Sequence, residues 1–421
     1  MKSILIATGL VIVAGAASAA IPLGRGEVTP QVTATATYDS NVFGTHDATG
    51  DFMGTLAPRV AYERKAGQIE AEAHAGISFI RFLDQSQLDA DNLDLDATLR
   101  LPGAEYRNFS GSLSASYVEA SQVNSDLNAR INTKTTTYDG RADVTTGVHS
   151  NLTLSGNYTD TARSLGSDQQ ILTSEAVYAY RDFFYGNSLR LLANYETLQS
   201  SGDNALGVPL DQSAYTFSAG LERAFAHDTL RGGFTYGYRV LDRSAAETTT
   251  GTQRQAGPVI TATLDGPFLP AKYFPKVTSH LALSYQDAAT PGINDTGTKA
   301  VTGSLGLEWQ ARATTVVSFN AIRSQRLAAN DLSVVATTLQ LELAQELRYN
   351  LTGSLTAGYD WSTFRTINRQ DRTTLLSAGL KYHFARAWDA TFTYAYSSVN
   401  STVVQSSFDR HLLSLGLTRK F

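Results

Sequence analysis

Apolar and polar side chains alternate with a period of two in stretches of about ten residues that recur along this chain. From residue 301 to 310, for example, Val301, Leu305 and Trp309 stand at odd positions, whereas Thr302 and Glu308 stand at even positions. Successive side chains of a β-strand point to opposite faces, so each stretch predicts a strand with one apolar and one polar face. The pattern runs from residue 28 to the end without a break in composition. It predicts an all-β chain with a single domain over residues 20–421.

The connections between these stretches alternate in length. Short ones such as His149–Asn151 and Arg348–Asn350 take turns with longer polar ones such as Asp39–Asp51, Ser121–Thr133 and Ser200–Gln212. Short periplasmic turns and long extracellular loops are typical of transmembrane antiparallel up-and-down β-barrels. A soluble β-sandwich has no reason to sort its loops in this way. We therefore predict an integral protein of the bacterial outer membrane, in contact with its lipid.

The number of strands should be even, because both termini of such barrels normally face the periplasm. The alternation gives 20 strands, with Thr29–Tyr38 as the first and Arg410–Phe421 as the last. If the first stretch or Gly257–Asp265 is not a full strand, the count falls to 18. The predicted fold is thus a single barrel of 18–20 strands.

The first 19 residues have the composition of a cleaved signal peptide. Lys2 gives a positive start, Ile4–Ala16 is an apolar core, and Ala17–Ala19 supplies small residues at a cleavage site. A transmembrane anchor would need about 20 apolar residues, which is more than this run has. We expect residues 1–19 to be removed on export, with the barrel following directly and no globular plug domain before it.

Composition excludes several kinds of chemistry. The chain has no Cys, which excludes disulfides, thiolate metal sites and a cysteine nucleophile. Its 34 Lys and Arg against 39 Asp and Glu give a net charge of −5, so nucleic acid is not an expected partner. Asp89 begins an acidic run, but a calcium loop counted from there needs Gly at its sixth position and Glu at its twelfth, where Asp94 and Arg100 stand.

A catalytic site is not predicted. His74 shares a strand face with Glu70 and Glu72, yet no nucleophile can be assigned beside it, and a hydrogen bond in the lumen is the commoner explanation. The chain shows no nucleophile elbow, phosphate loop or zinc spacing. We expect a protein that is not an enzyme and that needs no cofactor or metal.

The polar strand faces carry charges of both signs that we expect to line the lumen: Glu70, Glu72, Asp94, Asp96, Arg100, Arg190, Arg231, Arg239, Glu342 and Glu346. A mixed, slightly acidic wall suits water and neutral polar solutes and gives no strong preference for anions. Alternatively, these charges pair with one another and fill the lumen. Large inward aromatic residues are scarce, so a polymer inside would be weakly held.

The last strand carries an apolar face formed by Leu413, Leu415, Leu417 and Phe421, interrupted by Arg419. This face resembles the C-terminal strand by which bacterial outer-membrane proteins are recognised for barrel insertion. The resemblance implies that the barrel-assembly machinery is a partner.

Two short runs resemble the opening of the Putative beta-barrel porin 2 family. They are Val28–Val32 (VTPQV) and Thr37–Phe43 (TYDSNVF), the second with an aromatic-Asp-x-Asn pattern, and a strand ending near Pro58 follows. The resemblance implies an outer-membrane β-barrel that is often associated with secreted exopolysaccharide or capsule. It implies no catalytic residues.

The expected function is that of a conduit or assembly component for the export of an extracellular polysaccharide, with polysaccharide-export components as possible partners. A general diffusion porin for small polar solutes is the first alternative. A structural or adhesive barrel, whose long outer loops bind a ligand, is the second. The sequence does not indicate an oligomeric state.

Overall fold

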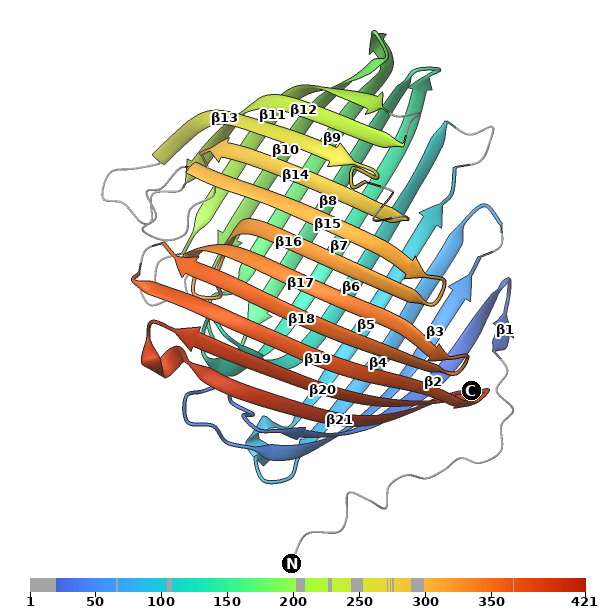
Figure 1. Ribbon diagram of the computed structural model, residues 1–421, viewed down its shortest axis with the longest axis vertical. Helices are drawn as coiled ribbons and strands as arrows, with labels where there is room; N and C mark the ends of the chain where they lie inside the picture. The colour runs from blue at the N-terminus through green and yellow to red at the C-terminus, as the bar shows by residue number, and fades with distance from the viewer. Residues whose placement is uncertain are drawn as a thin grey trace, which may run out of the picture.

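The computed structural model describes residues 20–65, 67–103, 108–201, 209–225, 229–243, 253–270, 272, 274, 276–288, 299–365 and 367–421. In these residues, twenty antiparallel strands, β2 to β21, form one closed sheet (Figure 1). A short strand, β1 (Ile21–Leu23), pairs only with the start of β2. The expected all-β barrel is confirmed, and of the two expected strand numbers the larger one is correct. The predicted signal peptide, residues 1–19, lies outside the described residues.

The first half of the barrel consists of β2 (Gly26–Asp39), β3 (Asp51–Arg64), β4 (Glu70–Phe82), β5 (Ala90–Leu101), β6 (Phe109–Asn124), β7 (Ala129–Gly147), β8 (Ser150–Arg163), β9 (Gln169–Phe184), β10 (Asn187–Ser200) and β11 (Asp211–Phe225). The second half consists of β12 (Leu230–Arg243), β13 (Gln253–Asp265), β14 (Val277–Asp287), β15 (Lys299–Arg312), β16 (Thr315–Leu327), β17 (Ser333–Arg348), β18 (Leu351–Phe364), β19 (Arg369–Ala385), β20 (Trp388–Ser401) and β21 (Phe408–Lys420). Two 3₁₀ turns, η1 (Ser86–Leu88) and η3 (Val404–Ser406), lie in connections.

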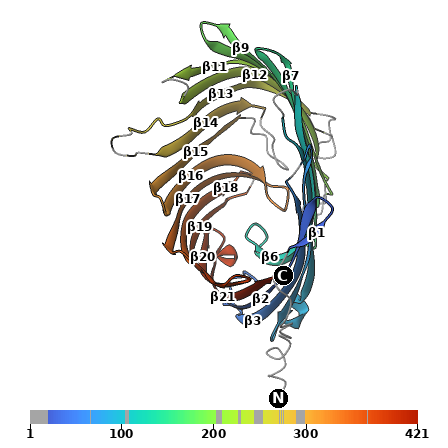
Figure 2. The ribbon, with the colours of Figure 1, turned by 90° about the vertical axis from the view of Figure 1, so that its right-hand side faces the viewer.

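Each strand pairs with the next one along the chain, and β21 pairs with β2 to close the sheet. In this closing pair Gln31 lies opposite Lys420, and Asp39 lies opposite Leu412. Figure 2 shows the later strands facing a wall made of the earlier ones across the interior. The arrangement is an up-and-down barrel without a free edge, so the strands find their backbone hydrogen-bond partners in neighbouring strands.

The pairing register explains the alternating sequence. Leu339 and Leu341 of β17 lie opposite Tyr359 and Ala357 of β18, so their side chains share one face of the sheet. A shift by one residue would move this apolar set to the other face. A two-residue turn, Tyr185 and Gly186, joins β9 to β10. Both residues have positive φ angles, 48° and 74°. Two-residue β-hairpin turns favour positive φ, because their twist then matches that of the flanking strands.

The strands are longer than the alternating stretches suggest. The first full strand covers Gly26–Asp39 rather than Thr29–Tyr38, and the loop expected at Ser121–Thr133 shrinks to residues 125–128. The ladder continues through Asn124, which pairs with Ala129. Polar Ser, Thr, Gln and Asn residues extend the hairpin here, and they lack the apolar alternation by which a strand is predicted.

We call the end of the barrel that holds the connections after β2, β4, β6 and the other even-numbered strands the loop end, and the opposite end the turn end. Most fully buried apolar side chains gather at the loop end, among them Val42, Ile131, Leu241, Val334 and Phe364. The packed core of this protein therefore lies across one opening of the barrel. Among the described residues, no helix has the length and apolar character needed to cross a membrane.

Candidate functional site

Large apolar side chains cover one face of the sheet and remain exposed there. Phe217 is 65% exposed, Leu355 53% and Leu415 61%. Side chains of this size are rarely left in water in such numbers, so this face has the apolar character that contact with lipid requires.

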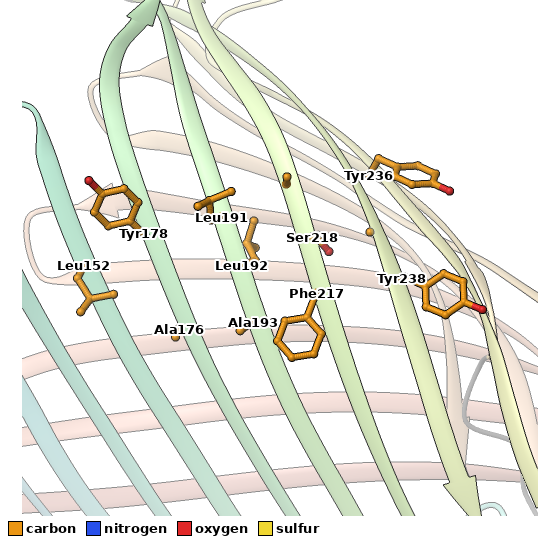
Figure 3. Close-up of a pocket in the computed structure, with 12 residues that line it drawn as sticks. Leu152, Ala176, Tyr178, Leu191, Leu192, Ala193, Phe217, Ser218, Tyr236 and Tyr238 are labelled. Carbon is orange, nitrogen blue, oxygen red and sulfur yellow. The ribbon is translucent and has the colours of Figure 1, made fainter.

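A groove of about 590 Å³ crosses this apolar face over β8 to β12 (Figure 3). Small residues such as Ala176 and Ala193 form its floor, and Phe217, Tyr236 and Tyr238 stand at its sides. Because it opens on this apolar face, it is separate from the interior of the barrel.

Contacts between distant strands identify the opposite face as the inner one. Arg326 of β16 contacts Asp126, which lies in the connection between β6 and β7. Gln169, at the start of β9, contacts Asp331 in the connection between β16 and β17. Contacts between strands so far apart in the sheet can form only through the interior. The register then places all ten candidate lumen residues on this inner face.

On β4 and β5 the candidate residues form a cross-strand charge cluster. Arg100 Nη1 donates to Glu72 Oε1 at 3.1 Å, and His74 Nε2 lies 3.1 Å from Asp94 Oδ1. His74 Nδ1 is 3.7 Å from Asp96. His74 thus makes the lumen hydrogen bond that was expected for it.

Two further candidates are paired, Arg190 with the neighbouring strand β11 and Arg239 with β10, which lies two strands away. Arg190 Nη1 lies 3.2 Å from Glu222, and Arg239 Nη2 lies 3.0 Å from Glu196. Glu342 accepts a hydrogen bond from Gln340 at 2.5 Å. For the side chains of Glu70, Arg231 and Glu346, the described structure shows no hydrogen bond or ion pair. Some candidate lumen residues therefore pair with other side chains of the barrel wall, whereas others carry charges that make no such contact.

The strongest interactions across the interior lie at the loop end, where we distinguish three ties. The first is centred on Asp39, the fully buried end residue of β2. Arg410 of β21 donates to its two oxygens at 2.9 and 2.6 Å, and Arg130 of β7 donates at 3.2 Å. Arg130 also donates to the Val42 carbonyl at 2.6 Å, which fixes the first loop over the opening.

The second tie involves the turn Ser125–Asn128 between β6 and β7, which we call the latch. Arg326 donates to both carboxylate oxygens of Asp126 at 2.7 and 2.9 Å. Arg369 of β19 donates to the carbonyls of Ser125 and Asp126, each at 2.9 Å. Asn128 Nδ2 donates to Ser406 Oγ at 2.7 Å. Figure 2 shows the latch between the two walls, beside η3.

The third tie joins the β16–β17 turn to the opposite wall. Asp331 accepts hydrogen bonds from Gln169 Nε2, at 3.0 Å, and from Ser200 Oγ. The Ser167 amide donates to the Ala329 carbonyl at 2.8 Å. Beneath this turn, Ala328, Val334 and Phe364 form a buried cluster with Leu332 packed against it.

Together the three ties and the apolar cluster draw loops from both walls across the loop end. Sequence reasoning missed this site entirely. Its acidic centres, Asp39, Asp126 and Asp331, stand in or next to polar connections, where a charged residue gives no sign of a distant partner. A buried cross-barrel network is the arrangement expected of a structure that restricts an opening.

The residues of the predicted insertion signal lie at the closing seam. Leu413, Leu415 and Leu417 face outward on β21, and the Phe421 amide donates to the Pro30 carbonyl at 2.9 Å. The Arg419 guanidinium lies 5.3 Å from the ring centre of Trp388 and 4.5 Å from that of Phe421. Arg419 therefore interrupts the apolar face where aromatic rings surround its charge.

In the described part of the chain, no group of three or more His, Asp or Glu residues could hold a metal ion. The candidate site consists of the polar inner wall and the three ties at the loop end.

The family model for Putative beta-barrel porin 2 matches residues 18–177 and 282–421. The chain belongs to this family. The match leaves out β10 to β13 but includes the two runs on which the resemblance was based, so that prediction is confirmed. The protein is an outer-membrane-type β-barrel of a porin family. A search of curated proteins gave no match.

Solved structures with a similar fold are large barrels at very low sequence identity. The iron transporter FrpB from Neisseria meningitidis is 9% identical, with 93% of this chain and 82% of that chain covered and a TM-score of 0.52. The ferric-catecholate import receptor Fiu from E. coli K12 is 9% identical over 93% and 82%, with a TM-score of 0.51. The ferric citrate transporter FecA is 10% identical over 93% and 78%, with a TM-score of 0.52. These similarities concern the fold alone.

Proposed function

We propose that the protein is an integral conduit of the bacterial outer membrane that exports an extracellular polysaccharide, with its loop end at the cell surface. The proposal that the protein is a conduit is supported by the width of the barrel together with its polar inner face. Barrels of 16–18 strands already leave an aqueous channel unless loops fill it. A 20-strand wall has more interior than its own side chains can fill.

Three ties at the loop end support a conduit that is closed at rest. A permanently open porin would gain nothing from drawing Arg130, Arg326 and Arg369 onto carboxylates and carbonyls of distant strands and loops. The Arg326–Asp126 ion pair is suited to a reversible closure, because Arg326 is 41% exposed and a partly exposed ion pair contributes only modest stability. The proposal includes no catalytic step.

The cargo is proposed from family membership and from the character of the wall. Charges of both signs, mostly paired, among Ser, Thr and Asn side chains suit a neutral polar chain better than an anion. The alternative of a general diffusion porin is supported by the family's description as a porin. A structural or adhesive barrel is supported by the packed loop end.

The test combines conductance with a cellular measurement. Purified protein in a planar bilayer should show brief openings of modest selectivity, and deletion of the gene should reduce surface polysaccharide. Conductance with unchanged polysaccharide would favour the diffusion porin. A bilayer that stays silent even after the ties are broken by mutation would favour the structural barrel.

A further inference from the structure

A small cavity of about 240 Å³, lined by polar and glycine residues, lies in the inner wall over β6 to β9. The residues that line it include Asp139, Glu175, Asn157, Ser112 and Thr173, which carry carboxylate, amide and hydroxyl groups. Glu175 belongs to the same strand face as Gln169, which reaches across the interior, so the cavity opens to the lumen and not to lipid. None of the proposed roles described so far uses it.

The register builds this cavity from two adjacent rows of polar side chains. In one row Arg141 lies opposite Ser112 on one side and Ser155 on the other, and Ser155 lies opposite Glu175. In the next row Asn157 lies between Asp139 and Thr173. Neighbouring strands are about 4.8 Å apart, so each row presents hydrogen-bonding groups at short, regular intervals.

The hydrogen bonds already made show what remains for a ligand. Arg141 uses Nε and Nη2 to bind Asp143, at 2.8 and 3.0 Å, and keeps its Nη1 donors. Asp139 accepts from Asn157 at 2.5 Å. For the Glu175 carboxylate, the described structure shows no hydrogen-bond partner. The cavity thus offers a free carboxylate acceptor, guanidinium donors and several hydroxyls within one small space.

We propose that this cavity binds a single neutral sugar unit, so that it is a saccharide subsite in the wall of the conduit. A sugar hydroxyl both donates and accepts, which matches carboxylates and guanidinium donors placed side by side. Two carboxylates beside an arginine that is already paired disfavour an anion. An apolar ligand would leave these polar groups unsatisfied. The identity of the ligand as part of an exported polymer rests on the proposed function, whereas the subsite itself rests on the cavity.

The test measures binding to the full-length protein in detergent by isothermal titration calorimetry. The probes are three neutral hexasaccharides (maltohexaose, cellohexaose and laminarihexaose), a glucosamine hexamer as the cation and a galacturonate hexamer as the anion. At least one neutral probe should bind. Glu175→Ala should weaken it about tenfold, since a hydrogen bond to a charged group is lost, and Asn157→Ala severalfold. Glu308→Ala, which removes a carboxylate from β15 outside this cavity, should leave affinity unchanged.

Failure of all three neutral probes would overturn the subsite, as would wild-type affinity in both cavity variants that keep the wild-type thermal unfolding midpoint. Stronger binding of the cationic or the anionic hexamer would overturn the neutral class of ligand. This result does not depend on transport. If the protein binds a neutral hexasaccharide but shows no conductance, the subsite is supported and the proposed conduit is contradicted.

Discussion

Breaking the latch should open the conduit. Asp126→Ala removes both hydrogen bonds from Arg326, at 2.7 and 2.9 Å, and leaves the backbone bonds from Arg369 in place. The Asp126 side chain is only 12% exposed and that of Arg326 is 41% exposed. The pair therefore stands between an exposed ion pair, which contributes up to about 1 kcal/mol, and a charged hydrogen bond away from water, which contributes about 1.5–3 kcal/mol.

A loss of about 1.4 kcal/mol changes an equilibrium about tenfold. If the latch holds the closed state, the open probability of single channels in a planar bilayer should rise about tenfold in Asp126→Ala. Arg326→Ala should give a similar rise, and the double variant should give little more, because both substitutions remove the same interaction. High salt should also favour opening in the wild type and less so in the variants, since 1 M salt shortens the screening length to about 3 Å.

A matched control is available on the same hairpin. Lys134 of β7 makes an ion pair with Glu119 at 3.2 Å, and this pair lies on the outer face. Lys134→Ala removes a charge of the same hairpin without touching the latch, so it should leave the open probability unchanged. The reasoning is refuted if Asp126→Ala and Arg326→Ala gate like the wild type, or if Lys134→Ala opens the channel equally.

Three further outcomes are expected. Replacing Glu342 and Glu346 with Gln should weaken the preference of the open channel for cations, measured as reversal potential in a salt gradient, without lowering the thermal unfolding midpoint. Deleting Phe421 should reduce the amount of heat-modifiable barrel in isolated outer membranes, while total synthesis stays constant. Epitope tags within 200–212 should react with antibody on intact cells, whereas a tag at 226–227 should react only after lysis; equal labelling of both sites would overturn the proposed topology.

The barrel wall could be predicted from the sequence because the alternation of apolar and polar residues is visible within each strand. The period of two that sets Leu339 against Gln340 is visible in a single strand, and the lipid-facing side of each strand follows from it. Strand ends were less predictable. Hydroxyl and amide residues such as Asn124 and Asn132 extend the β6–β7 hairpin to the latch, where contacts with other loops replace the apolar–polar alternation of the wall.

The ties could not be predicted, for a reason of geometry. Asp126 and Arg326 are 200 positions apart, and their contact depends on the number of strands between them, the tilt of the wall and the shape of two turns. Each of these quantities is encoded elsewhere in the chain. The shape of the first loop, for example, depends on Gly44, which has a positive φ of 67°. A Cβ at this position would lie 2.0 Å from the Val123 side chain, so the first loop can pack over the opening only with glycine.

The position of the packed core also bears on how the protein works. A wide barrel cannot fill its interior with wall side chains, so the middle of the wall is stabilised by the hydrogen-bonded ladder, and burial is concentrated where loops meet. Opening such a mouth costs the ties and the cluster around Val334 and Phe364, but leaves the ladder intact. The free energy of opening the loop end is therefore separate from the free energy of unfolding the barrel wall. A substitution at the loop end can change gating without unfolding the wall, which is the condition that a gated conduit requires.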